Sequence, residues 1–230
     1  MLKFKHMESP RATPVVPSIV GLVVALGWPF LFILLAHGAQ EGLGARQDLL
    51  LLLKEWVAAL IVLGILSYWE RRSITSVGMR RPKWSDVGAG VGVFILMFFA
   101  VNVVSAILDA MHLRSELSDQ GAIANIPLGI RVALFLTAGI CEEFLFRGYA
   151  IERMTELTRS RWIGAVVPCV LFSLGHGPRY GWGAGLLAVL AVSAGLTVLY
   201  AWRRNLPVNM GIHALIDAIG LFVVPSVVHH

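Results

Sequence analysis

Two adjacent glutamates and an arginine interrupt a long apolar run in the stretch Cys141–Tyr149, CEEFLFRGY. If that run lies in a membrane, each charged side chain near the bilayer centre costs about 2.5–3.5 kcal/mol on insertion scales, so such residues are usually functional. The other polar residues set in apolar runs include two histidines and an aspartate, His176, His213 and Asp217. Because carboxylates and imidazoles are the usual general acids and bases, this set indicates acid–base chemistry.

Helical spacing gives the two glutamates different surroundings. Glu143 and Arg147 are four residues apart, so they share one helix face and can form an ion pair. Glu142 is rotated by about 100° from Glu143 and has no cation four residues along. A desolvated carboxylate without a cation can act as a general base, so Glu142 is a candidate for that role.

The histidines lie on two further apolar runs. His213 and Asp217 share a helix face, as do Phe172 and His176, because each pair is four residues apart. Counted along their helices at 1.5 Å per residue, Glu142 and His213 reach the same half of the bilayer and His176 lies nearer its middle. We therefore expect three helices to converge on one polar cavity.

These stretches resemble the motifs of the CPBP intramembrane proteases, the group that includes the CAAX prenyl endopeptidases and bacterial Abi-type proteins. EEFLFR is similar to the motif EExxxR, FSLGH to FxxxH, and HALID to a later HxxxN-type motif. The three occur in the family's order on separate apolar runs, between Pro127 and Val224. The resemblance implies a glutamate-dependent membrane endopeptidase.

The resemblance also implies roles for individual residues. Glu142 would activate a water, His176 would position or deprotonate it, and His213 with Asp217 would stabilise the oxyanion. The residues implied to support the site are Glu143, Arg147 and Phe172. Asp217 departs from the family pattern, because the prenyl endopeptidases have asparagine there. Ionised aspartate cannot donate a hydrogen bond, so Asp217 must be protonated or must orient His213.

Two kinds of alternative remain open at the level of sequence. Glu142, His176 and His213 are reasonable zinc ligands with water in the fourth place, although there is no HExxH motif and our expectation is a site without a cofactor. The same polar set could serve a proton-coupled transporter or channel, or belong to a non-catalytic membrane scaffold. No internal repeat of the kind common in transporters is visible.

The composition is that of a membrane protein. The 230 residues are 57% hydrophobic and 14% charged, whereas soluble domains carry about 25% charged residues. The net charge of +5 comes from basic residues flanking apolar runs, which indicates membrane topology rather than nucleic-acid binding. Few runs alternate with period two, so we predict an all-α, polytopic transmembrane bundle.

Seven apolar runs are candidate spans, of which the fifth is short, and an eighth, weaker one would change the side of the C-terminus. The predicted runs are Val15–Ala36, Leu49–Trp69, Val87–Leu108, Pro127–Ile151, Trp162–Gly175, Gly183–Trp202 and Leu206–Val224. The polar segment His112–Ile126 is predicted to be a loop or an interfacial helix. We divide the chain into a basic tail (1–14), accessory spans (15–126), a CPBP-like catalytic core (127–224) and a C-terminal tail (225–230).

Basic residues predict the orientation of these spans. With the N-terminus in the cytoplasm, fourteen Lys and Arg residues fall on the inner side and three on the outer, as the positive-inside rule requires. We predict a multi-pass protein of the cell's inner membrane, with a membrane-anchored protein or peptide as substrate and the bilayer as its surroundings. Nothing in the sequence specifies a prenyl pocket or an oligomeric state. Tyr149, Trp162 and Trp202 are predicted to be interfacial anchors.

Overall fold

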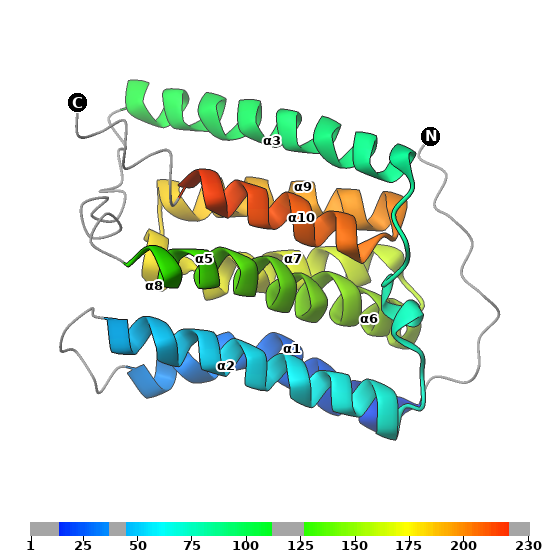
Figure 1. The fold of residues 1–230 in the computed structure, drawn as a ribbon. Coiled ribbons are helices and arrows are strands. Elements are labelled where there is room, and N and C mark those ends of the chain that lie inside the picture. Colours follow the sequence, from blue (N-terminus) through cyan, green and yellow to red (C-terminus); the bar gives the residue numbers. More distant parts are fainter. Residues whose placement is uncertain (1–13, 37–44, 112–126, 221–230) are drawn as a thin grey trace.

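The computed structural model of the protein describes residues 14–36, 45–111 and 127–220. These ranges are almost entirely helical and contain no strand. In chain order the elements are α1 (Val15–Ala36), α2 (Ala45–Gly64), η1 (Ile65–Trp69), η2 (Ile74–Val77), α3 (Trp84–Ala110), α5 (Leu128–Thr137), η3 (Ala138–Ala150), α6 (Ile151–Thr158), α7 (Arg161–Gly175), α8 (Gly177–Tyr180), α9 (Ala184–Arg203) and α10 (Leu206–Ala218) (Figure 1).

Within the described residues, all seven predicted apolar runs fall on these helices, which confirms the predicted helical membrane bundle. By length and composition, three described helices can cross a membrane, over Leu52–Trp69, Trp84–Leu108 and Gly185–Arg203. Two shorter apolar helices cover Val15–Leu31 and Arg161–Gly175. The number of crossings stays a prediction, as does the domain division. The N-terminal tail up to residue 13, the segment 112–126 and residues 221–230 lie outside the described residues.

Local signals fix the ends of the helices that carry the histidines. Ser160 and Asn205 precede α7 and α10, and each side chain accepts a hydrogen bond from a first-turn backbone N–H. At the other boundary, α6 and α9 end at Arg159 and Arg204, whose backbones are left-handed, with φ of 55° and 47°. Each of these helix-to-helix connections therefore turns the chain within two residues and sets the neighbouring helix at a defined start.

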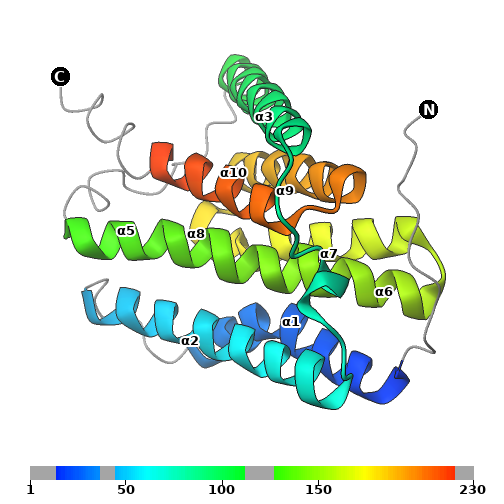
Figure 2. The ribbon, with the colours of Figure 1, turned by 45° about the vertical axis from the view of Figure 1, so that its right-hand side comes forward.

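The helix α5–η3–α6 runs through the centre of the bundle, and η3 is its most enclosed part. Helices α1, α2, α7 and α10 all pack against η3. Two views agree on a tiered arrangement in which α1 and α2 lie on one side of this central helix and α10 and α9 on the other, with α3 outermost (Figures 1 and 2). The glutamate-containing stretch is therefore surrounded by other helices.

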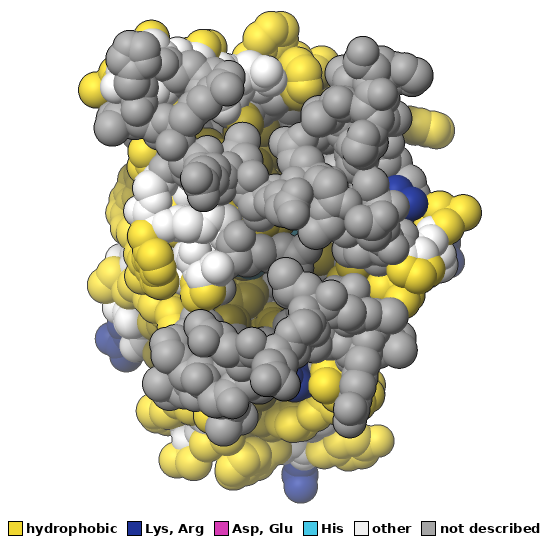
Figure 3. All heavy atoms as spheres, turned by 90° about the vertical axis from the view of Figure 1, so that its left-hand side faces the viewer, with side chains coloured by type: hydrophobic (Ala, Val, Ile, Leu, Met, Phe, Trp, Pro, Cys, Tyr) yellow, Lys and Arg dark blue, Asp and Glu magenta, His cyan; other side chains and the backbone are white. Residues whose placement is uncertain are grey.

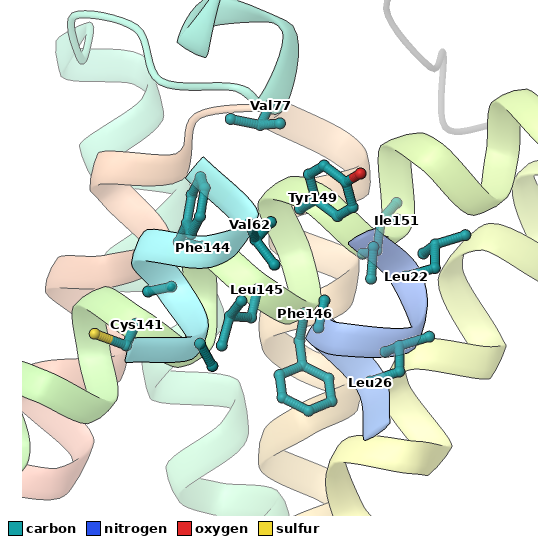
Figure 4. Packing of buried hydrophobic residues seen from close by; sticks show 14 of the residues in the cluster. Leu22, Leu26, Val62, Val77, Cys141, Phe144, Leu145, Phe146, Tyr149 and Ile151 are labelled. Atoms are coloured by element: carbon teal, nitrogen blue, oxygen red, sulfur yellow. The ribbon is translucent and has the colours of Figure 1, made fainter. Parts of the chain in front are cut away.

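Two hydrophobic clusters hold the tiers together. The larger one joins η3 to α1 and α2, with Leu145 and Phe146 facing Leu26 and Val62 (Figure 4). The smaller one joins α3, α9 and α10 through Met97, Leu196, Leu199, Val208 and Ile212. Burying a large apolar side chain stabilises a fold by about 1.5–3 kcal/mol relative to leaving it in water. The clusters therefore stabilise the bundle most where the helices would otherwise contact water.

Charged residues gather at one end of the bundle, which we call the basic end: the end of η1, the start of α3, the end of α6, the start of α7 and the end of α9. Cross-helix ion pairs connect these elements there, apart from the start of α7, for which none is described. The pairs are Arg72–Glu156, Arg153–Glu70, Arg203–Asp86 and Arg204–Glu152. In addition, Arg80 donates to the last backbone carbonyls of α9. Long-range polar contacts therefore fasten the helices to one another at this end.

The outer surface carries many large apolar side chains, as expected for helices in contact with lipid. Along α3, Leu96 and Phe99 are more than half exposed. At the opposite end from the basic end, the described side chains on view are largely hydrophobic (Figure 3).

One of the three predicted interfacial anchors is wrong. Trp162 and Trp202 are exposed, at 76% and 37%, but Tyr149 is fully buried. Its hydroxyl donates to Glu70 Oε1 at 2.6 Å, beside the Arg153–Glu70 ion pair. A buried carboxylate that needs hydrogen-bond donors therefore holds this tyrosine inside the bundle.

Candidate active site

The helix η3 that carries the two glutamates is wound as a π-helix over Ala138–Ala150. Short π segments within α-helices are frequent at functional sites. The expectation of regular α-helical geometry was therefore wrong for this stretch, although the four-residue pairing of Glu143 with Arg147 is preserved. Both glutamates are buried, and they face different partners.

Glu143 is completely buried and has three side-chain partners. Arg147 Nη1 lies 2.8 Å from its Oε1, His213 Nδ1 lies 2.9 Å from the same oxygen, and Asn209 Nδ2 lies 3.0 Å from Oε2. A buried carboxylate is stable only when it is paired and hydrogen-bonded, and here both oxygens have donors. Glu143 therefore fixes the position of His213 as well as pairing with Arg147.

Arg147 is also held on all sides. It is 1% exposed, and its Nη2 donates to Ser193 Oγ at 2.9 Å. Its guanidinium carbon lies 4.2 Å from the centre of the Phe172 ring, which is a cation–π geometry. Phe172 thus supports the arginine of the first motif from the helix that bears His176.

Glu142 faces the two histidines. The distance from His176 Nε2 to Glu142 Oε1 is 3.8 Å, and that from His213 Nε2 to Glu142 Oε2 is also 3.8 Å. Both distances exceed a direct hydrogen bond, and polar groups at such a separation are commonly bridged by water. Its side chain is 9% exposed and that of His176 is 25% exposed, so the group is within reach of solvent.

The tautomer of His176 follows from its backbone contact. Its Nδ1 lies 2.8 Å from the carbonyl oxygen of Phe172. Because a carbonyl can only accept, Nδ1 must carry the proton, and in the neutral ring Nε2 is left with a lone pair toward Glu142. The ring contacts those of Phe172 and Tyr180, at centroid distances of 4.4 and 5.9 Å, and these contacts restrain its plane.

Asp217 lies at the outer edge of the group. Its Oδ2 is 3.7 Å from His213 Nε2, and its side chain is 31% exposed. The four-residue spacing therefore does bring Asp217 to His213, at a distance longer than a direct hydrogen bond. All four residues assigned to catalysis, Glu142, His176, His213 and Asp217, lie together in the structure.

Close backbone approach brings α10 against η3. A Cβ at Gly139 would lie 2.9 Å from both the Ala214 side chain and the Met210 carbonyl oxygen. Only glycine leaves room for α10 at this separation. The contact lies one residue along from His213 on α10, so it sets the distance between that histidine and the glutamates.

Sequence analysis missed two polar residues of the site. Asn209 precedes His213 by four residues, and this spacing, which places both on one helix face, could have identified it. Ser193 carries no such signal, because it reaches Arg147 from α9 with no motif around it. Among the described residues, no group of three His, Cys, Asp or Glu side chains has the arrangement of a metal site. Cys141 and Cys169 are buried free thiols.

Comparison with known proteins agrees with this geometry. Residues 124–219, which include every residue described at the site, match the family of type II CAAX prenyl endopeptidases described as Rce1-like. This part of the chain is similar to an Rce1-like domain. The resemblance seen in the three sequence motifs is thereby confirmed.

One curated relative of the chain is the UPF0177 protein YvdC of Lactococcus lactis subsp. lactis (strain IL1403). It is 27% identical over 137 residues, which are 56% of this chain and 50% of the relative. The chain therefore matches about half the length of that relative. No solved structure matches the chain.

Proposed function

We propose that the protein is a membrane-embedded endopeptidase in which Glu142 activates the water that attacks the scissile carbonyl. One observation carries the proposal: the two oxygens of Glu142 each lie 3.8 Å from a histidine Nε2, and those nitrogens belong to two different helices. The match of residues 124–219 to a family of CAAX endopeptidases supports the reaction class.

The first step is hydrolytic attack. A water bound between Glu142 and His176 gives a proton to Glu142 while its oxygen bonds to the scissile carbon, and the carbonyl becomes an oxyanion. His176 Nε2 orients the water by accepting its second hydrogen. When the tetrahedral intermediate collapses, the carbon–nitrogen bond breaks, and Glu142 returns its proton to the leaving amine. General-base assistance of this kind is worth typically about 10²–10⁴ in rate.

His213 serves the oxyanion in this scheme. Its Nδ1 donates to Glu143, so Nε2 is the nitrogen directed at the reacting group. A donor held in place before reaction stabilises developing charge without reorganisation. Asp217, 3.7 Å from that nitrogen, acts by supporting and orienting protonated His213 rather than by donating to the oxyanion itself. For Asp217, which departs from the family pattern, the proposal therefore adopts the orienting role.

The substrate is a protein or peptide tethered to the membrane. His176 and Asp217 are the partly exposed members of the group, at 25% and 31%, so in this scheme a substrate peptide reaches Glu142 from their side. Whether the tether is a prenyl group is tested by offering the same peptide in two forms, with a farnesyl thioether or a transmembrane anchor.

The experiment compares the purified chain with Glu142→Gln on both tethered peptides, with cleavage located by mass spectrometry. We expect cleavage by the unmodified protein and loss of cleavage in the variant. The same preparations in liposomes report proton flux. Flux that depends on Glu142, without cleavage of either peptide, would replace the protease by a proton-coupled transporter.

A further inference from the structure

Helix α9 carries none of the residues assigned to catalysis, yet it is bonded to both helices that bear the histidines. Ser193 Oγ donates to the Cys169 backbone carbonyl oxygen of α7 at 3.1 Å, and it accepts from Arg147 Nη2 at 2.9 Å. The Leu196 carbonyl oxygen of α9 accepts from Asn209 Nδ2 of α10 at 2.8 Å. One turn of α9 is therefore hydrogen-bonded to α7 and to α10.

These contacts close a ring through Glu143. Asn209 Nδ2 also donates to Glu143 Oε2 at 3.0 Å, and Glu143 Oε1 accepts from Arg147 Nη1 at 2.8 Å. The ring runs from Glu143 to Arg147, through Ser193 and one turn of α9, and back through Asn209. All four of these side chains are at most 1% exposed. Because buried polar groups cannot exchange a lost partner for bulk water, each contact in the ring constrains the next.

Asn209 is an unfavourable residue for packing alone. Its side chain is fully buried, and its Oδ1 has no hydrogen-bond partner among the described residues. A buried acceptor without a partner is unfavourable, whereas an apolar side chain of similar size carries no such cost. Its Nδ2 is used fully, because it contacts two acceptors, Glu143 Oε2 and the Leu196 carbonyl oxygen. What asparagine provides at this position is therefore its pair of N–H groups.

Those N–H groups determine how the Glu143 carboxylate is oriented. Within the described residues, Asn209 is the one donor to Oε2, which leaves Oε1 toward Arg147 and His213. The terminal torsion of a glutamate has a broad energy well, so without that donor the carboxylate can rotate. His213 Nδ1 would follow Oε1, and its Nε2, now 3.8 Å from Glu142 Oε2, would change its place in the site.

We propose that Asn209 is a positioning residue for His213 and acts on it through Glu143. The two residues are four apart on α10, so they share a helix face, and each donates to a different oxygen of the same carboxylate. Glu143 of η3 is thereby held at two points along α10. The inference rests on the proposed function, because His213 is the oxyanion donor of that scheme.

Nitrogen NMR of the full chain in detergent, with isotope-labelled histidine, tests the proposal without relying on proteolysis. The His213 signals are assigned by their loss in His213→Asn, whose amide keeps a donor toward Glu143 and lacks Nε2. In Asn209→Leu we expect the Nδ1 signal to shift, because its hydrogen bond to Glu143 changes. Asn209→Ala gives the same comparison with a side chain that cannot clash. The matched control is Asn102→Leu on α3, where the amide donates only within its own helix, to the Phe98 carbonyl oxygen, and this control should leave the signal in place.

Cleavage of a tethered peptide supplies the second readout. Asn209→Leu should lower kcat by about 10²-fold, since a misplacement of about 1 Å can have an effect of that size, and should leave KM nearly unchanged. In the His213→Asn background the same substitution should have no further effect, because the nitrogen that Asn209 positions is already absent. A purely structural role would lower the residual activity again, because a distorted η3 also displaces Glu142.

The two readouts separate this inference from the proposed function. An unchanged His213 signal, an unchanged kcat, or a further loss in the His213→Asn background would each overturn the positioning role. Failure of both Asn209 variants to fold would also overturn it, because the asparagine would then belong to the scaffold. If the signal shifts and the unmodified protein cleaves no tethered peptide, the proteolytic function is refuted and the placement of His213 by Asn209 stands.

Discussion

His213 Nδ1 lies 2.9 Å from Glu143 Oε1, and the same oxygen accepts from Arg147 Nη1 at 2.8 Å. One carboxylate oxygen thus joins the arginine of the first motif to the histidine of the third. The two glutamates have different contacts. Glu143 connects residues of neighbouring helices, whereas Glu142 faces the Nε2 atoms of the two histidines. Predictions for the two residues differ accordingly.

Glu142→Gln should give a stably inserted protein of normal abundance with almost no cleavage. The amide keeps the shape of the side chain and removes the base, so the rate should fall by about 10²–10⁴. The measurement is activity per folded molecule on one tethered peptide. Glu156→Gln makes the same change at the basic end and should retain activity. Cleavage by Glu142→Gln at the unmodified rate would mean that another group is the base.

Glu143→Gln and Arg147→Ala should both lose abundance as well as activity. Each leaves a buried charge without its partner, and breaking a buried pair is typically destabilising by about 3–5 kcal/mol. Arg147 cannot lower this cost by extending its guanidinium to the membrane interface, because it is 1% exposed and contacts Ser193 and Phe172. Thermal unfolding in detergent measures the loss. Variants as stable as the unmodified protein would refute a structural role for the pair.

Gly139→Ala should lower both stability and activity. The added methyl would meet Ala214 and the Met210 carbonyl oxygen at 2.9 Å, and overpacking of this kind is typically destabilising by about 1–3 kcal/mol. Moving α10 also separates His213 from Glu143. Gly211→Ala is the control on α10, since a Cβ there meets nothing within 4 Å. That control should be neutral or slightly stabilising. Equal effects of the two substitutions would contradict the proposed contact.

Activity should survive chelation, because a carboxylate and two histidines suffice to activate water. The purified protein would be assayed before and after extended treatment with a zinc chelator, followed by metal content analysis. Loss of cleavage that added zinc restores would instead make Glu142, His176 and His213 metal ligands.

The loop Arg71–Lys83 should face the cytoplasm and the segment His112–Ile126 the opposite side. Both native cysteines are buried, so a single introduced cysteine can be labelled selectively. A membrane-impermeant thiol reagent applied from outside should modify Ser118→Cys and spare Arg81→Cys. Labelling of Arg81→Cys alone would reverse the orientation inferred from the basic residues.

The sequence predicted the helices well, because a bilayer demands long apolar runs and these are visible without any partner. It also predicted the ion pair of Glu143 with Arg147 and the proximity of Asp217 to His213, since both pairs lie within one helix. These are relations that a fixed spacing determines.

Relations between helices were harder to predict. Ser193 contacts Arg147, which lies 46 residues earlier in the chain, and no sequence periodicity within α9 predicts that contact. Tyr149 looked like an interfacial anchor because its ring is amphipathic, and only its position beside Glu70 shows that the hydroxyl is used inside the bundle. The π winding of η3 was likewise not predicted from the spacing of its residues.

The ion pairs of the basic end carry a consequence for biosynthesis. The partners of these pairs are far apart in the sequence. Arg153 follows Glu70 by 83 residues, Arg203 follows Asp86 by 117, and Arg204 follows Glu152 by 52. Glu143 likewise obtains His213 only 70 residues later. While the chain is being inserted, the early helices therefore hold acidic groups whose partners have not yet emerged from the ribosome. These ion pairs form only after α9 and α10 have been synthesised and inserted. A nascent chain stopped after α7 therefore retains carboxylates without partners, which is a feature that membrane quality control can recognise.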